Sequence, residues 1–147
     1  MTDFVVDASV AGKWVLPVER ERFAIEAHEV LNAYERSEIK LLVPELFWAE
    51  CANIFWKVRR RGEISGDFAA RAMASLLELN IPTFPIQPLA AKALATSLQY
   101  DRAAYDCFYL ALADLTGRPL LTADERLANA MGAHFPIRWL GSAGGVL

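Results

Sequence analysis

The stretch Phe4-Val5-Val6-Asp7 decides the fold prediction, because three apolar residues without alternation are followed at once by a carboxylate. A strand covered by helices on both faces is apolar throughout, whereas a strand with one solvated face alternates. The ranges 41–43 and 119–122 have the same apolar character. We therefore predict that these three strands lie in the centre of a mostly parallel sheet.

Longer segments between these strands repeat their apolar residues at the spacing of a helix. We expect helices over 23–34, 45–61, 68–77, 88–99 and 103–116, a short helix from Asp124, and two further strands over 83–86 and 137–140. Alternating strands and helices are typical of an α/β domain. No repeat, low-complexity tract or linker divides the chain, so residues 1–147 are expected to form one domain, with a loose tail over about 141–147.

The composition excludes several classes of protein. The chain has 147 residues, of which 54% are hydrophobic, so it is neither disordered nor too small for its own core, and a buried oligomer face is expected. No apolar stretch approaches the roughly 18–20 residues of a membrane helix. No basic region precedes the first apolar run, so we expect neither a membrane span nor a secretory signal. Cys51 and Cys107 are too few for a disulfide framework, which favours a reducing cytoplasm.

Among the ionisable side chains, the carboxylates are the main candidates for catalysis or metal binding. The net charge is -3, so the molecule as a whole does not attract nucleic acid, and any such contact must be local. With only His28 and His134, neither a histidine-rich metal site nor a Ser-His-Asp hydrolase is favoured.

Two aspartates follow predicted central strands. Asp7 comes directly after the first strand, and Asp124 comes just past the strand at 119–122. Ligands of parallel sheets bind beyond the carboxyl ends of the strands. An aspartate in this position also commonly caps the helix that follows, so for each residue taken alone both interpretations remain open.

Two further acids lie within the most apolar helices. Glu50 has apolar residues at its i−4, i−3 and i+4 positions, which places it on the face that packs on the sheet, unless it lies at the solvated edge of that face. Asp106 lies in the first turn of its helix, although Asp101 could cap the same helix. A buried carboxylate requires a cation, a hydrogen-bond donor or a proton.

The combination of these acids is more informative than any one of them. Asp7, Glu50, Asp106 and Asp124 could converge at one edge of the sheet, with no histidine or thiolate among them. Carboxylates so close together repel one another unless protons or divalent cations neutralise them. Oxygen-only ligands suit Mg²⁺ or Mn²⁺, and Mg²⁺ commonly also takes phosphate oxygens from its substrate. The constellation therefore predicts phosphodiester chemistry.

With these residues in place, the chain resembles the PIN-domain family, in particular the VapC-type ribonuclease toxins of toxin–antitoxin pairs. The resemblance covers essentially the whole chain and rests on four segments in family-like order. These are VVDASV at 5–10, PELFWAE at 44–50, YDCFYLALA at 105–113 and LTADERL at 121–127. By this resemblance Asp7, Glu50, Asp106 and Asp124 are the acidic quartet that holds metal and catalyses, and Ser9 and Thr122 are polar supporters of the site.

The resemblance also implies a fold, an activity and partners. It implies a three-layer α/β/α fold, dependence on Mg²⁺ or Mn²⁺, endonucleolytic cleavage of RNA, a homodimer, and inhibition by a cognate antitoxin that binds across the active-site groove. In the expected mechanism, carboxylate-held ions activate a water molecule that attacks phosphorus and leaves 5′-phosphate and 3′-hydroxyl ends. Because the 2′-hydroxyl is not the nucleophile in this scheme, DNA stays open as a substrate.

Four basic residues close the helix that carries Glu50. Lys57, Arg59, Arg60 and Arg61 could bind RNA phosphates, or they could only stabilise the negative end of the helix. Three other functions remain open at this point. They are an antitoxin-independent PIN nuclease of RNA processing, a Mg²⁺-binding signalling domain and a non-catalytic RNA-binding domain.

Overall fold

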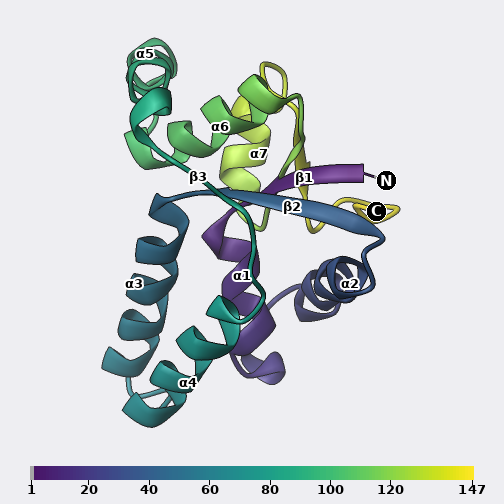
Figure 1. The fold of residues 1–147 in the computed structure, drawn as a ribbon, viewed down its shortest axis with the longest axis vertical. Coiled ribbons are helices and arrows are strands. Elements are labelled where there is room, and N and C mark those ends of the chain that lie inside the picture. Colours follow the sequence, from purple (N-terminus) through teal and green to yellow (C-terminus); the bar gives the residue numbers. More distant parts are fainter. Residues whose placement is uncertain (1) are drawn as a thin grey trace.

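In the computed structural model, which describes residues 2–147, one parallel sheet forms the centre of the molecule (Figure 1). Its strands are β1 (Thr2–Val6), β2 (Ile39–Pro44), β3 (Thr83–Phe84), β4 (Leu120–Thr122) and β5 (Ile137–Trp139). They lie in the order β3-β2-β1-β4-β5, and every neighbouring pair is parallel. The predicted parallel sheet is confirmed, with the three apolar strands β2, β1 and β4 at its centre.

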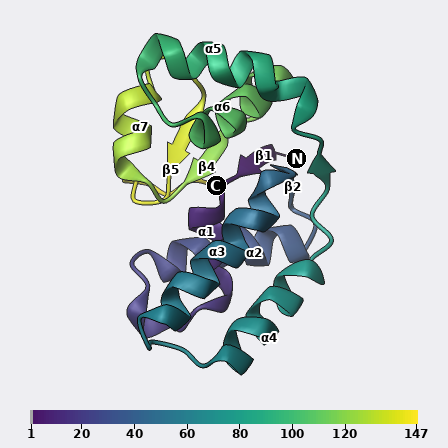
Figure 2. The ribbon, with the colours of Figure 1, turned by 90° about the vertical axis from the view of Figure 1, so that its left-hand side faces the viewer.

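Helices cover both faces of this sheet, so the predicted three-layer α/β/α fold is confirmed (Figures 1 and 2). The helices are α1 (Ala8–Val15), α2 (Ala24–Glu35), α3 (Leu46–Arg60), α4 (Gly66–Leu77), α5 (Ala90–Tyr100), α6 (Ala104–Thr116) and α7 (Glu125–Met131). Helices α5, α6 and α7 lie on one side of the sheet, and α1 and α2 lie on the other. Helices α3 and α4 pack on each other and extend away from the sheet.

The core lies on both sides of β1. Phe4, Val5 and Val6 are completely buried, and so are Leu120 and Leu121 of β4. Burying one such side chain stabilises a fold by about 1.5–3 kcal/mol. The apolar strands therefore fix the backbone at the points where β1 and β4 end, and these points position the candidate site.

Three details differ from the sequence-based expectations. Helix α1 was not among the predicted helices, although Asp7 was considered as the cap of a following helix; it has eight residues and includes Gly12. Strand β3 comprises only two of the four residues expected at 83–86. The suggestion that Asp101 caps α6 is wrong, since Asp101 ends α5 in a left-handed conformation with φ 53° and Ala103 precedes the first turn of α6.

The last residues of the chain contact the rest of the molecule. Val146 is buried, and its carbonyl oxygen accepts a hydrogen bond of 2.8 Å from the Arg138 guanidinium. The looseness expected for residues 141–147 stays a prediction. Within residues 2–147, no helix combines the length and the apolar character needed to cross a membrane.

Candidate active site

The carboxyl ends of β1 and β4 lie side by side at the point where the strand order reverses. From β1 the chain continues to β2 on one side of the sheet, whereas β4 lies on the other side. Such a reversal is where open α/β sheets commonly bind ligands. A cavity of about 220 Å³ lies at these strand ends, with Asp7 and Asp124 in its wall.

All four predicted acids line this single cavity. Asp7 follows β1, Glu50 comes from α3, Asp106 from the first turn of α6, and Asp124 from the start of α7. The remaining lining residues are Ala8, Ser9, Asn53, Ile54, Lys57 and Tyr109. Segments that are more than 100 residues apart in the chain therefore bring carboxylates to the same place.

Asp7 is buried and caps α1. Only 8% of the residue is exposed, and its Oδ1 accepts a 2.9 Å hydrogen bond from the Ser9 backbone N–H and a second from the Ser9 hydroxyl. Burial raises the pKa of Asp7 to about 6, the Glu50 charge adds to the rise, and hydrogen bonds from Ser9 and Thr122 oppose it. The capping role and the place in the cavity therefore occur together.

Ser9 and Thr122 connect the two strand ends. The Ser9 hydroxyl oxygen also accepts a 3.0 Å hydrogen bond from the Ala123 backbone N–H, which ties the start of α1 to the end of β4. Thr122 is completely buried, and its hydroxyl oxygen accepts a 3.0 Å bond from the Asp124 backbone N–H. These two hydroxyls fix the backbone that carries Asp7 and Asp124.

Glu50 contains a buried oxygen without a partner. Its Oε1 is inaccessible to solvent and makes no hydrogen bond, and the same is true of the nearby Tyr109 hydroxyl. Burial raises the pKa of Glu50, the Asp106 charge raises it further, and the Tyr109 hydroxyl opposes the rise. Burial and the Glu50 charge raise the pKa of Tyr109, so that its hydroxyl stays protonated.

Asp106 faces both a cation and a second carboxylate. Burial raises its pKa, the Arg102 guanidinium lowers it, and the Asp124 charge raises it. Asp124 is exposed, and one of its carboxylate oxygens caps α7 by accepting a 3.1 Å hydrogen bond from the Leu127 backbone N–H. Asp124 therefore has a structural role as well as a place in the cavity wall.

The carboxylates that line the cavity are of the chemical type that binds a divalent cation. The carboxylates influence one another in pairs, Asp7 with Glu50, Glu50 with Asp106, and Asp106 with Asp124. Within residues 2–147, no three acidic, cysteine or histidine side chains lie close enough together to hold a metal ion as they are placed, so these acids line the cavity without converging on one point. The unpartnered Glu50 oxygen and the four carboxylates, with no histidine or cysteine among the lining residues, suit a hard ion such as Mg²⁺ or Mn²⁺.

The basic residues at the end of α3 divide into two groups. Lys57 lies in the cavity wall, two turns from Glu50 on the same face of the helix. Arg59 is exposed, Arg60 lies over the Trp56 ring, and Arg61 forms an ion pair with Glu63. Among the four, only Lys57 is placed beside the carboxylates.

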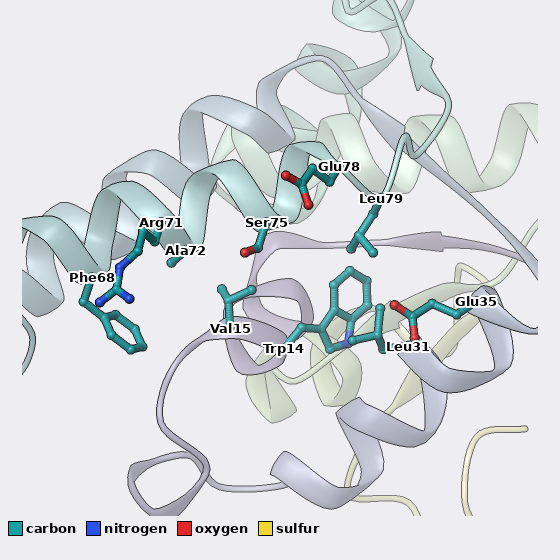
Figure 3. A pocket seen from close by; sticks show the side chains of 10 residues that line it. All are labelled: Trp14, Val15, Leu31, Glu35, Phe68, Arg71, Ala72, Ser75, Glu78 and Leu79. Atoms are coloured by element: carbon teal, nitrogen blue, oxygen red, sulfur yellow. The ribbon is translucent and has the colours of Figure 1, made fainter.

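A second cavity lies away from the strand ends (Figure 3). Its volume is about 560 Å³, and its walls come from α1, α2, α4 and the turn after α4. Trp14 and Leu31 contribute apolar surface, whereas Glu35 and Glu78 are exposed. None of the predicted site residues lines this cavity.

Comparison with known proteins places the chain in a family. A family model described as PIN domain matches residues 4–132, which is most of the chain. The chain belongs to the PIN-domain family. This membership is consistent with the parallel sheet and with the acids at its carboxyl edge.

Individual relatives support the same assignment. The chain is 33% identical to Ribonuclease VapC3 of Pyrobaculum aerophilum over 131 residues, which cover 88% of this chain and 95% of that protein. The crystal structure of PAE2754 from the same organism superposes with a TM-score of 0.66 at 25% identity, covering 88% of this chain and 79% of that one. A chain of a toxin–antitoxin complex from Klebsiella pneumoniae shares the fold, with a TM-score of 0.60 at 15% identity over 92% and 95% of the two chains.

The sequence analysis missed several side chains around the carboxylates. Tyr109 lies one helical turn after Asp106, and Asn53 lies one turn after Glu50. Both could have been found from their spacing of three residues, which places them on the same helix face as the acid. Arg102 precedes α6 by two residues and shows no comparable periodic signal.

Proposed function

We propose that this PIN-domain protein is a metal-dependent endoribonuclease and acts as the toxin of a toxin–antitoxin pair. The observation that carries the proposal is that Asp7, Glu50, Asp106 and Asp124 all line one cavity at the carboxyl ends of β1 and β4. The similarity to a protein named Ribonuclease VapC3 supports RNA as the substrate.

Asp7, Glu50 and Asp106 would hold Mg²⁺ or Mn²⁺, and Asp124 would complete the acidic wall. The ion would make a water molecule a better nucleophile at neutral pH and would offset the charge that develops on the phosphate. The hydrogen bonds from Ser9 hold the Asp7 carboxylate in place for this role. The protonated Tyr109 hydroxyl, which makes no hydrogen bond in this structure, would orient Glu50 by donating one to it.

Lys57 would guide the RNA backbone into the cavity. A net-acidic protein needs local cations to hold a polyanion, and the Lys57 ammonium lies in the wall that the phosphates must pass. Arg59, Arg60 and Arg61 could contribute from farther along α3. The stacking on Trp56 and the ion pair with Glu63 leave Arg60 and Arg61 less available than Lys57.

The proposed partners are a cognate antitoxin and a second copy of this chain, in the cytoplasm. A similarly folded protein occurs in a toxin–antitoxin complex, and an antitoxin that covers the acidic cavity would exclude both metal and RNA. Leu94 and Leu98 lie one turn apart on α5 and are 56% and 76% exposed, which favours an oligomer face there. Cys51 and Cys107 are free and buried, which fits a reducing compartment.

The test is cleavage of end-labelled single-stranded RNA by the purified protein with Mg²⁺, Mn²⁺ or EDTA. We expect cleavage only with metal, and we expect Asp106→Asn to lower the rate by about 100-fold or more because a metal ligand is lost. Glu78→Gln, a neutralisation in the second cavity, serves as the matched control and should cleave normally. EDTA-resistant cleavage, or an equal loss in both variants, would contradict the proposal.

A further inference from the structure

Arg102 lies in the connection between α5 and α6, and both its backbone N–H and its backbone carbonyl form hydrogen bonds. Its N–H donates a 3.3 Å hydrogen bond to the Ser97 carbonyl, and its own carbonyl accepts a hydrogen bond from the Ser97 hydroxyl. Ser97 belongs to the last turns of α5. The guanidinium is therefore attached to a rigid part of the structure.

This guanidinium faces one of the proposed metal ligands. Arg102 Nη2 lies 3.7 Å from Asp106 Oδ2, and the two side chains are 23% and 34% exposed. The contact is an ion pair without a hydrogen bond, and Arg102 Nε is buried without any acceptor. The guanidinium therefore approaches one oxygen of Asp106 and is not locked into a two-bond arrangement.

The other site carboxylates have no such partner. Within residues 2–147, Asp106 is the one acid of the four that forms an ion pair. Asp7 is stabilised by hydroxyl and backbone donors, and Glu50 lies near the Tyr109 hydroxyl and the Asp106 carboxylate without an ion pair. The Arg102 guanidinium therefore lies beside Asp106, which lines the cavity, although Arg102 itself is not among the lining residues, where Lys57 is the basic side chain.

We propose that Arg102 is a tethered counter-cation that competes with the divalent metal ion for Asp106 and lowers the metal affinity of the resting site. This inference rests on the proposed metal site. A guanidinium and a metal dication repel each other when they share one carboxylate, and this repulsion survives solvent screening at separations of a few ångströms. Arg102 is a positioning residue in this account, since it acts through Asp106 and not on the substrate.

The experiment is calorimetric titration of the purified full chain with MnCl₂ in the absence of RNA. Arg102→Met and Arg102→Gln should bind Mn²⁺ about fivefold tighter than the natural chain, because the competing charge is gone. Arg102→Lys keeps a positive charge and should stay within about twofold of the natural chain.

Arg118→Met is the matched control. Arg118 forms an ion pair with Asp3 at 3.5 Å, with side-chain exposures of 28% and 32% that resemble those of the Arg102 pair. Asp3 and Asp7 are separated by four residues of extended chain, about 13 Å. Arg118→Met should therefore leave the Mn²⁺ affinity unchanged.

A second measurement separates this role from general damage to the fold. Both neutral variants at Arg102 should melt at a lower temperature than the natural chain without metal, because Asp106 has lost its counter-charge, and yet they should bind Mn²⁺ more tightly. Equal or weaker Mn²⁺ binding by both variants would overturn the inference while leaving the metal site intact. Absence of Mn²⁺ binding by the natural chain would overturn both this inference and the proposed function.

Discussion

Two cavities that each have at least two carboxylates in their walls differ in how those carboxylates are held. The cavity at the ends of β1 and β4 is the smaller, about 220 Å³, and burial and neighbouring carboxylates raise the pKa values of three of its acids, Asp7, Glu50 and Asp106. The cavity between α1, α2 and α4 is about 560 Å³, and its Glu35 and Glu78 are exposed (Figure 3). Size therefore does not identify the site. The site is identified instead by carboxylates that the fold keeps buried although their charged form is more stable in water.

The origin of this difference lies in the sheet. Asp7 follows three completely buried residues, so the strand that anchors the core also delivers the carboxylate into the interior. Glu35 and Glu78 lie at the ends of α2 and α4, where water solvates them. Only in the first arrangement does burial of the ionised carboxylate cost free energy, and a bound cation would offset this cost.

The largest effect on stability is expected for Asp7→Asn in metal-free protein. The pKa of Asp7 is raised from 3.8 to about 6, so the folded state holds its proton more strongly than the unfolded chain. Ionisation of Asp7 therefore lowers the free energy of unfolding as the pH rises from about 4 to about 6. Above that range the free energy of unfolding is lower by up to about 3 kcal/mol. Asp7→Asn should be more stable than the natural chain at pH 7.5 and similar to it at pH 3.5.

Urea unfolding in EDTA at the two pH values checks this prediction. Glu35→Gln is the control from the second cavity and should change stability little at either pH. The comparison between the cavities fails if Asp7→Asn is no more stable than the natural chain at pH 7.5, or if Glu35→Gln gains as much.

A second effect concerns added metal. At 100 times the dissociation constant, a bound ion stabilises the folded chain by about 2.7 kcal/mol, which raises the melting temperature by about 5–10 °C. Thermal melts with and without MnCl₂ should show this rise for the natural chain and for Glu78→Gln, and should show little or none for Asp106→Asn. A rise that survives in Asp106→Asn would place metal binding elsewhere.

The smallest effect is expected at the positive end of α3. Lys57 lines the first cavity, whereas Arg61 forms an ion pair with Glu63 outside it. Asp106→Asn protein is expected to bind RNA without cutting it. In this protein, the further change Lys57→Met should weaken RNA binding about three- to fivefold and reduce the slope of its salt dependence by about one phosphate contact. Arg61→Met should change binding less, as measured by fluorescence anisotropy at several salt concentrations. Equal losses would indicate a diffuse positive surface.

The sheet and the place of the acids could be predicted from the sequence. In an α/β domain, an apolar run without alternation, such as residues 4–6, is commonly a strand covered by helices on both faces. An acid that follows such a run lies at the edge of the sheet where ligands bind. Glu50 was predicted because a carboxylate in an apolar helix face requires a partner. These signals are local, so one sequence is enough to detect them.

The remaining features depend on contacts between distant segments. Helix α1 is stabilised by the Asp7 cap at its start and by its packing on α2 and α3. The approach of Arg102 to Asp106 depends on the hydrogen bonds to Ser97 at the end of α5. Likewise, the sequence shows four basic residues after Glu50 but not that Lys57 alone turns toward the cavity.

The most direct test of the central claim is a crystal of the purified protein soaked in MnCl₂ and measured for anomalous scattering of manganese. We predict a peak within coordination distance of Asp7, Glu50 and Asp106 at the ends of β1 and β4, and no peak there in Asp106→Asn crystals. A peak between Glu35 and Glu78 with none at the strand ends would contradict the account, and so would well-diffracting crystals that bind no manganese.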